Sequence, residues 1–242
     1  MDGLIEQEKI CLIFQPAGIG DVLFLQKICH IYHEKGFKVY LPVCPQILWL
    51  ADYLPKNIVT ICDWGGDFPK KEYYRYHGDS IFTDDFVYLA LSTADEKVRG
   101  KIMETKYKLL GHDCFDYASY LKFERKKEKE DRLFYDILGL KDDEEYIFLN
   151  KNYGTPPKVT VYPVPISTSM RIVEIYISDE FNIFDWCKVY ENAKEIHMVE
   201  TSINYILETL ELKADVLNLY SRRPNDFSEV DYLFRKPWNK IK

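Results

Sequence analysis

The sequence lacks a long apolar run, since no stretch approaches the roughly 20 consecutive apolar residues that a membrane-spanning helix needs. Its opening segment, Met1–Lys9, is acidic and polar, unlike the basic and then apolar pattern of a secretory signal. We therefore expect no membrane span and a cytoplasmic protein.

Paired cysteines are also missing. None of the 6 cysteines forms a CxxC pair, and no His/Cys cluster has the spacing of metal ligands, so we expect no bound metal. Most of them lie in apolar runs, where a reduced cysteine packs as a small hydrophobic residue, and this indicates a reducing compartment. The formal net charge of -7 argues against broad binding to nucleic acid or to anionic membranes.

What the sequence does contain is an alternation of strand and helix patterns. The apolar run Ile10–Phe14 is typical of a strand buried on both faces, and helical spacing follows from Asp21 until Gly36. Lys38–Val43 then supplies the second strand of a parallel β–α–β unit. The chain is 47% hydrophobic, which suffices for a buried core.

A second α/β segment follows, and we place the boundary so that the halves are residues 1–135 and 136–242. Between the clear patterns, residues 63–84 are rich in Gly, Asp, Tyr and Lys and predict a long loop. Helices are expected at 46–53, 94–111, 112–124, 183–191 and 203–210, and strands at 58–61, 145–149, 158–162 (alone or in a hairpin), 171–177, 195–199 and 215–220.

The first candidate site is the loop Pro16–Asp21, at the carboxyl end of the first strand, where open parallel sheets bind ligands. Gly18 and Gly20 allow a ligand to approach the backbone, and the next helix offers unpaired amides. The loop is neither a dinucleotide fingerprint, because residue 23 is Leu, nor a P-loop, because no Gly-Lys-Ser/Thr follows. Asp21 is either a functional carboxylate or simply the N-cap of the helix.

The second candidate site is the strand-to-helix turn Glu200–Ser202. Thr201 and Ser202 offer hydroxyls and helix N-terminal amides, which together can hold a phosphate group without a metal. The alternative is ordinary helix capping, which Ser and Thr perform at many such junctions.

The third candidate is the polar loop that follows the buried strand at 145–149. It contains Lys151, which could neutralise phosphate charge, and Asn152, a polar neighbour. Arg171 begins a later strand and is a second possible partner for an anion. An ordinary solvated loop and a surface arginine are the alternatives.

Taken together, these segments resemble a known family. Gly18–Phe24 resembles the Gly-Asp loop that opens the first domain of lipopolysaccharide heptosyltransferases and related GT-B glycosyltransferases. Residues 181–187 and 192–203 look like the donor half of such enzymes. The family carries Asp-Thr-Gly and a His in its donor turn, whereas this chain reads Glu200-Thr201-Ser202, so the resemblance does not identify the sugar.

The resemblance implies a compact GT-B-like α/β fold of two facing Rossmann-like halves with parallel sheets and the active site between them. The acceptor-type half would come first and the donor-type half second. Asp21 would be the general base. Thr201 and Ser202 would hold the departing diphosphate, and Lys151 or Arg171 would supply the positive charge that a metal supplies elsewhere.

The resemblance also implies the reaction: sugar transfer from a nucleotide diphosphate donor to a sugar or glycan hydroxyl, inverting and metal-independent. The donor is a substrate, and no cofactor is expected. Trp238 and the aromatic residues near it could pack internally or against a second subunit, so a homodimer remains open.

Two other functions remain open at this point. One is a nucleotide-sugar-binding protein without catalysis. The other is a Rossmann-fold methyltransferase, because a glycine-rich turn after the first strand also binds S-adenosylmethionine. Methyltransferases usually place an acidic residue at the end of the second strand, whereas here that strand ends Leu41-Pro-Val-Cys44.

Overall fold

The computed structural model describes residues 8–74, 79–91, 102–155, 158–222, 227 and 230–241. The chain divides into two compact units, Met1–Glu124 and Arg125–Lys242. The predicted division, between residues 135 and 136, is therefore wrong. Residues 125–135 belong to the second unit because Arg125 forms an ion pair with Glu191 at 2.8 Å, and Phe134 packs against Tyr146.

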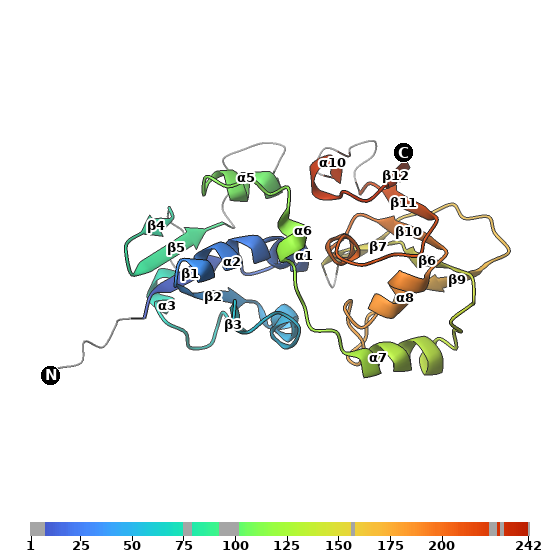
Figure 1. Cartoon of the computed structure of the whole chain (residues 1–242), viewed down its shortest axis with the longest axis horizontal. Coiled ribbons are helices and arrows are strands. Elements are labelled where there is room, and N and C mark those ends of the chain that lie inside the picture. The colour runs from blue at the N-terminus through green and yellow to red at the C-terminus, as the bar shows by residue number, and fades with distance from the viewer. Residues whose placement is uncertain are drawn as a thin grey trace. The chain divides into compact units, whose positions relative to one another are not determined.

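A mainly parallel sheet forms the centre of the first unit (Figure 1). Its strands lie in the order β3 (Thr60–Asp63), β2 (Lys38–Val43), β1 (Ile10–Phe14), β5 (Phe86–Ala90) and β4 (Ile81–Phe82). All pairings are parallel except β4 with β5. The central position of β1 explains its continuous apolar sequence, since Cys11, Leu12 and Ile13 are 0% exposed.

Helices of the first unit are short. They are α1 (Ile19–Phe24), α2 (Gln26–Glu34), the 3-10 helix η1 (Pro45–Asp52), α3 (Lys71–Tyr74), α5 (Ile102–Lys108) and α6 (Tyr117–Tyr120). The helix expected after Asp21 is confirmed, as two segments that meet at Leu25. Of the helix predicted at 94–111, residues 94–101 lie outside the described residues, and α5 is the part seen. The prediction for 112–124 is wrong, because only the single turn α6 forms there.

Five parallel strands form the main sheet of the second unit: β12 (Asn239–Ile241), β11 (Val216–Tyr220), β10 (Glu195–Val199), β6 (Tyr146–Asn150) and β9 (Arg171–Glu174), in that spatial order. The segment at 158–162 is one strand of a hairpin, in which β7 (Asn152–Thr155) pairs antiparallel with β8 (Lys158–Val161). The connection from β6 to β9 therefore carries this hairpin where a doubly wound fold has a helix.

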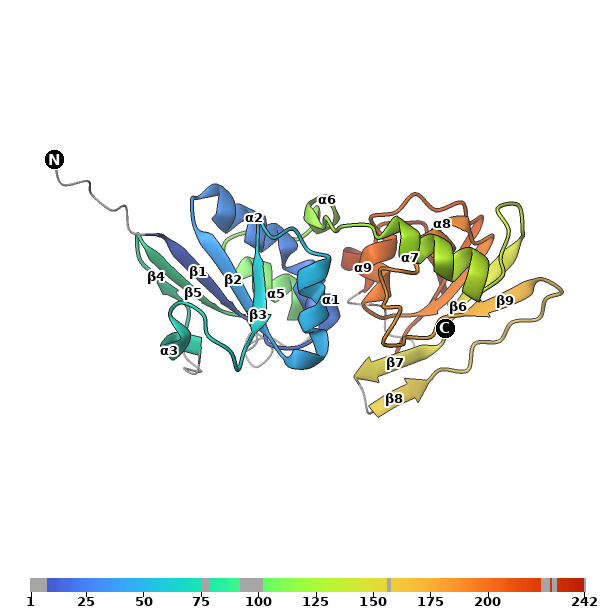
Figure 2. The same ribbon diagram turned by 90° about the horizontal axis from the view of Figure 1, so that it is seen from below.

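The helices of the second unit are α7 (Lys127–Asp131), the π-helix η2 (Arg132–Ile137), α8 (Cys187–Asn192), α9 (Ile203–Leu207) and α10 (Val230–Leu233). Figure 2 shows α7 beside α8, with the hairpin extending away from both. Phe148 of β6 packs against Tyr190 of α8, with ring centroids 4.9 Å apart. Trp238 is 8% exposed and donates to Glu208 Oε1 at 2.8 Å, so of the two possibilities for this residue the structure shows internal packing.

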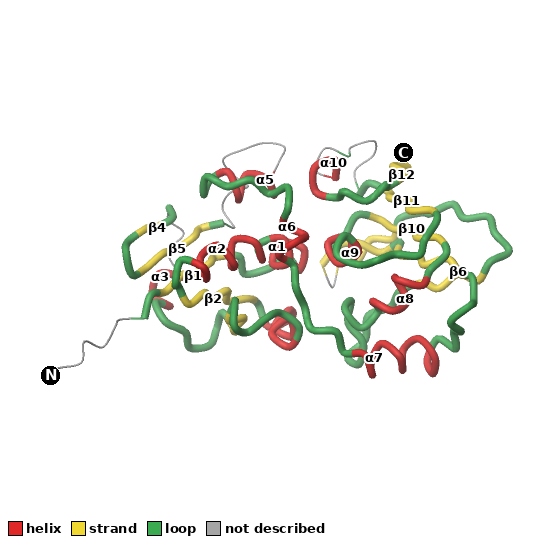
Figure 3. The backbone as a smooth tube through the Cα atoms, in the orientation of Figure 1, coloured by secondary structure: helices red, strands yellow, loops and turns green. Residues whose placement is uncertain are grey.

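The predicted fold class is confirmed: each unit alternates strands and helices around a parallel sheet, as the colours of Figure 3 show. In both sheets the strand order reverses once, next to β1 in the first unit and next to β6 in the second. Ligands of open α/β sheets bind at the carboxyl ends of strands at such a reversal. No helix among the described residues is long and apolar enough to cross a membrane.

Candidate functional site

The loop that contains Asp21 lies at the reversal of the first sheet, because β1 has β2 on one side and β5 on the other. Gly18 is the N-cap of α1 with φ 89° and ψ 100°, a conformation that favours glycine. Gly20 lies inside the helix. Asp21 is the third residue of α1, so the alternative in which it is the N-cap is wrong.

A buried lysine holds the Asp21 carboxylate. Lys106 Nζ, on α5, forms an ion pair with Asp21 Oδ1 and donates a hydrogen bond to Gln15 Oε1 at 2.7 Å. The Lys106 side chain is 2% exposed, whereas that of Asp21 is 29% exposed. Lys106 was not among the residues predicted from the sequence. Its signal was the helical spacing of Met103, Lys106 and Tyr107, which places the lysine on an apolar face.

The other oxygen of the same carboxylate lies against Gly18. A Cβ added to Gly18 would overlap Asp21 Oδ2 and would lie 3.2 Å from Asp21 Cγ. The absence of a side chain at residue 18 thus lets the carboxylate fold back over the loop. The result is a carboxylate that Lys106 holds at Oδ1, that has room for Oδ2 over Gly18, and that still reaches solvent.

In the second unit, Asn150 joins the loop after β6 to the turn after β10. Its Nδ2 donates to Thr201 Oγ1 at 3.2 Å, and its Oδ1 accepts from the Asn152 backbone amide at 3.2 Å. Asn150 is 2% exposed. These residues follow the carboxyl ends of β6 and β10, the pair of strands at the reversal, so two of the predicted loops belong to one polar cluster.

The amides of this turn are less available than the sequence pattern predicts. The Thr201 amide donates to Asn204 Oδ1 at 2.9 Å, the Asn204 amide donates to Thr201 O at 3.2 Å, and the Ile203 amide donates to Thr201 Oγ1 at 3.4 Å. Ser202 is the N-cap of α9 but makes no side-chain cap hydrogen bond. An anion at this turn would therefore depend on the Thr201 and Ser202 hydroxyls more than on these three amides.

Two more predicted residues lie at the same edge of the sheet. Lys151 forms an ion pair with Glu174 Oε2 at 2.8 Å, at the carboxyl ends of β6 and β9. Glu200 follows β10 and pairs with Arg222 at 3.1 Å. The charge of each is thus balanced by a neighbour.

Arg171 is the predicted residue that the structure does not bring to this cluster. It begins β9, and its guanidinium contacts Glu144 Oε1 at 3.0 Å and the carbonyl oxygen of Leu138. Because β9 is parallel to β6, this is the amino edge of the sheet, opposite the edge where β6 ends. Arg171 is not part of the site that we propose.

His197 lies on β10 in a separate hydrogen-bonded set. Its Nδ1 and the Tyr220 hydroxyl are 3.1 Å apart, and its Nε2 lies 3.1 Å from Glu195 Oε2. Burial raises the pKa of Tyr220, with the neighbouring Tyr162 as a smaller cause, so the phenol is protonated and can donate. The histidine is engaged on both ring nitrogens, which indicates a structural role.

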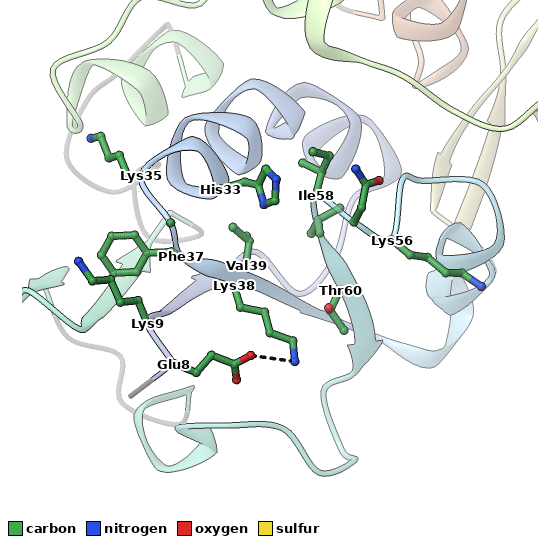
Figure 4. Close-up of a pocket in the computed structure, with 13 residues that line it drawn as sticks. Glu8, Lys9, His33, Lys35, Phe37, Lys38, Val39, Lys56, Ile58 and Thr60 are labelled. Atoms are coloured by element: carbon green, nitrogen blue, oxygen red, sulfur yellow. Dashed lines mark ion pairs between the residues drawn. The ribbon is translucent and has the colours of Figure 1, made fainter. Parts of the chain in front are cut away.

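One pocket, of about 670 Å³, is lined in the first unit by residues at the amino ends of β1, β2 and β3 (Figure 4). Lys9, Lys35, Lys38 and Lys56 surround it, and Lys38 pairs with Glu8 at 3.2 Å. Asp21 lies at the opposite edge of the same sheet, so this pocket is not part of the candidate site. Among the described residues, no group of three or more His, Cys, Asp or Glu side chains could hold a metal ion.

With this geometry in place, the likeness to known proteins is informative. The sequence matches no protein-family model and no curated protein. The structure is similar to a glycosyl transferase family 9 protein from Veillonella parvula DSM 2008, with a TM-score of 0.55 and 10% identity over 98% of this chain and 87% of that one. The chain shares its fold.

A weaker likeness is to the iron-containing, dodecameric heptosyltransferase TibC in complex with ADP-D-beta-D-heptose. The TM-score is 0.49 and the identity 12%, and the match covers 97% of this chain but 63% of TibC, less than two thirds of its length. A second TibC structure, from enterotoxigenic E. coli H10407, gives a TM-score of 0.44 at 12% identity.

Proposed function

We propose that this protein is a glycosyltransferase that moves a sugar from a nucleotide diphosphate donor to a sugar or glycan hydroxyl. The transfer inverts the anomeric carbon and requires no metal or further cofactor. The first unit binds the acceptor and the second binds the donor. The observation that carries this proposal is the Asp21 carboxylate, which Lys106 holds at the strand reversal of the first sheet. The fold of the chain, which is similar to that of a glycosyl transferase family 9 protein, supports it.

Asp21 acts as the general base. Its carboxylate takes the proton of the acceptor hydroxyl as that oxygen attacks the anomeric carbon. The bond between the anomeric carbon and the diphosphate oxygen breaks on the opposite face, and the electron pair leaves with the diphosphate. A 29% exposed carboxylate can meet a substrate hydroxyl, which a fully buried one cannot.

The turn after β10 receives the diphosphate. The hydroxyls of Thr201 and Ser202 donate to phosphate oxygens, and Asn150 Nδ2 orients Thr201 through its 3.2 Å hydrogen bond to the Thr201 hydroxyl. Lys151 supplies positive charge once a phosphate competes with Glu174 for its ammonium group. We further propose a cytoplasmic location, because all 6 cysteines are free.

The test is a thermal-stability screen against nucleoside diphosphates and nucleotide sugars, with and without EDTA. A ligand at about 100 times its dissociation constant stabilises a protein by roughly 2.7 kcal/mol, which is a measurable shift. We expect one nucleotide class to raise the melting temperature, equally in EDTA. No shift with any nucleotide, or a shift with S-adenosylmethionine alone, would contradict the proposal.

Two variants, one on each side of α9, localise the donor site. Thr201→Val removes the proposed phosphate ligand, and Thr209→Val removes a hydroxyl that donates to Ile206 O at 2.7 Å, just beyond the end of the same helix. Only Thr201→Val should abolish the nucleotide-induced shift. Donor binding without any Asp21-dependent transfer or hydrolysis would indicate the non-catalytic nucleotide-sugar-binding protein instead.

A further inference from the structure

Lys106 is an unusual residue for its position. Lysine is almost never fully buried unless it is paired, and this one is 2% exposed on the short helix α5. Both of its described partners lie far away in the sequence, on the loop after β1 and on α1: Gln15 Oε1 at 2.7 Å and Asp21 Oδ1. The lysine thus ties a distant helix to the carboxylate that we propose as the base.

Gln15 in turn fixes the lysine. Its Oε1 accepts from Lys106, while its Nε2 donates to the Ala17 carbonyl at 2.8 Å, so one amide links the ammonium group to the loop itself. Gln15 is 7% exposed, and its bonds are therefore shielded from water. The position of the Lys106 ammonium group is set by the same loop that ends at Gly18.

These contacts leave the two carboxylate oxygens in different situations. Oδ1 is paired with the ammonium group, whereas Oδ2 lies over Gly18, where a Cβ would displace it. A carboxylate on a free aspartate rotates among rotamers, but here the ion pair with Lys106 favours one rotamer, and the missing side chain at Gly18 leaves room for it. Oδ2 is the oxygen that remains to accept a proton.

We propose that Lys106 is a positioning residue, which holds the Asp21 carboxylate so that Oδ2 meets the acceptor hydroxyl; this inference rests on the proposed function. Lys106 itself is too buried to touch the substrate. Its effect comes through geometry, since a misplacement of about 1 Å at a reacting group can cost roughly 100-fold in rate. In the step, the acceptor proton moves to Oδ2, and Lys106 keeps its own protons.

The test compares kcat and the donor KM of Lys106→Met, Asp21→Asn and the double variant. We expect Lys106→Met to lower kcat by roughly 10- to 100-fold with the donor KM unchanged, because the donor binds to the other unit. The double variant should lose no more than Asp21→Asn alone. Lys106→Arg, which keeps the charge, should recover part of the loss.

Lys27→Met is the matched control. Lys27 is another buried lysine of the first unit, 8% exposed, and it pairs with Asp113 at 3.3 Å and with Asp116. Its loss should lower stability without changing kcat. If Lys27→Met lowers kcat as much as Lys106→Met, or if the losses from Lys106→Met and Asp21→Asn multiply in the double variant, the proposal is overturned.

Gln15→Leu keeps the test decisive if Lys106→Met does not fold. Gln15→Leu removes the acceptor that orients the Lys106 ammonium group, and it should lower kcat. The control Gln26→Leu loses a buried 3.0 Å hydrogen bond to Val22 O, and it should leave kcat unchanged. Equal effects of the two would overturn the proposal. Failure of the proposed function is separate, because the wild-type protein would then show no transfer with any nucleotide sugar.

Discussion

Replacing Gly18 by alanine tests the local geometry of the site without altering a functional group. Gly18 has φ +89°, and the added Cβ would overlap Asp21 Oδ2. Because that atom ends a flexible side chain, we expect Asp21 to rotate away and lose its ion pair with Lys106. The variant should therefore lose both stability and transferase activity.

The magnitude follows from a comparison with Gly36→Ala. Gly36 has φ +84° but no atom within 4 Å of its added Cβ, so Gly36→Ala loses stability only through backbone strain, about 1–3 kcal/mol. Gly18→Ala also introduces backbone strain, at φ 89° and ψ 100°, and it removes the carboxylate partner of the buried Lys106 ammonium group, which costs about 1–3 kcal/mol more. Urea unfolding, followed by amide hydrogen exchange in β1, would measure the stability loss of each variant in the first unit.

An Asp21→Ala background makes the reasoning refutable. Without the carboxylate, Gly18→Ala should cost less than it does in the wild-type background, because nothing remains for the new Cβ to displace. Equal costs of Gly18→Ala in the two backgrounds would refute the placement of Asp21 over the glycine.

Three further outcomes are expected. Asp21→Leu should destabilise by roughly 1–3 kcal/mol more in urea than Lys106→Met, because it leaves a 2% exposed cation unpaired, whereas a 29% exposed carboxylate can be hydrated. Glu208→Gln should cost about 1–2 kcal/mol in urea and alter the fluorescence of Trp238, whose indole donates to Glu208 at 2.8 Å. Burial lowers the pKa of His30, so the unfolded state takes up a proton at a higher pH than the folded state. The stability that this histidine contributes is therefore present above about pH 6.5 and is lost as the pH falls. In His30→Asn the free energy of unfolding should depend less on pH over this range.

Matched controls lie close to two of these residues. Glu211→Gln changes an exposed acid on the segment after α9, and it should leave Trp238 fluorescence unchanged. His33→Asn changes an exposed histidine on the same helix as His30 and should not flatten the pH dependence. A control that reproduces either effect would contradict the contact on which the prediction depends.

The sequence predicted the strands that are buried on both faces and surrounded by clear turns. β1, β2 and β10 were each found at their observed bounds, because continuous apolar runs mark such strands. β5 was missed although all of Phe86–Ala90 is buried. It follows a segment rich in loop residues, and its pairing with β1 is a tertiary contact that no local pattern records.

The candidate site divides in the same way. Gly18, Asp21 and Thr201 could be found because a glycine turn and a strand-to-helix junction are local features. Asn150 lies in the third predicted loop and Lys106 on an apolar helix face, but no local pattern predicts their bonds to Thr201 and Asp21, which join positions 51 and 85 residues apart. The expected free amides failed for a local reason: the Asn204 side chain, three residues on, accepts from the Thr201 amide, and the Thr201 hydroxyl accepts from the Ile203 amide.

The ion pair of Lys106 also bears on whether Asp21 is simply structural. A structural aspartate at a helix start would accept bonds from the first amides, yet Asp21 lies past the N-cap and turns to a lysine on another helix. Buried ion pairs contribute little net stability, because desolvation offsets their attraction, so stability alone does not account for burying this one. What the pair does provide is a single orientation for a carboxylate that is still 29% exposed, at the strand reversal where ligands of such sheets bind.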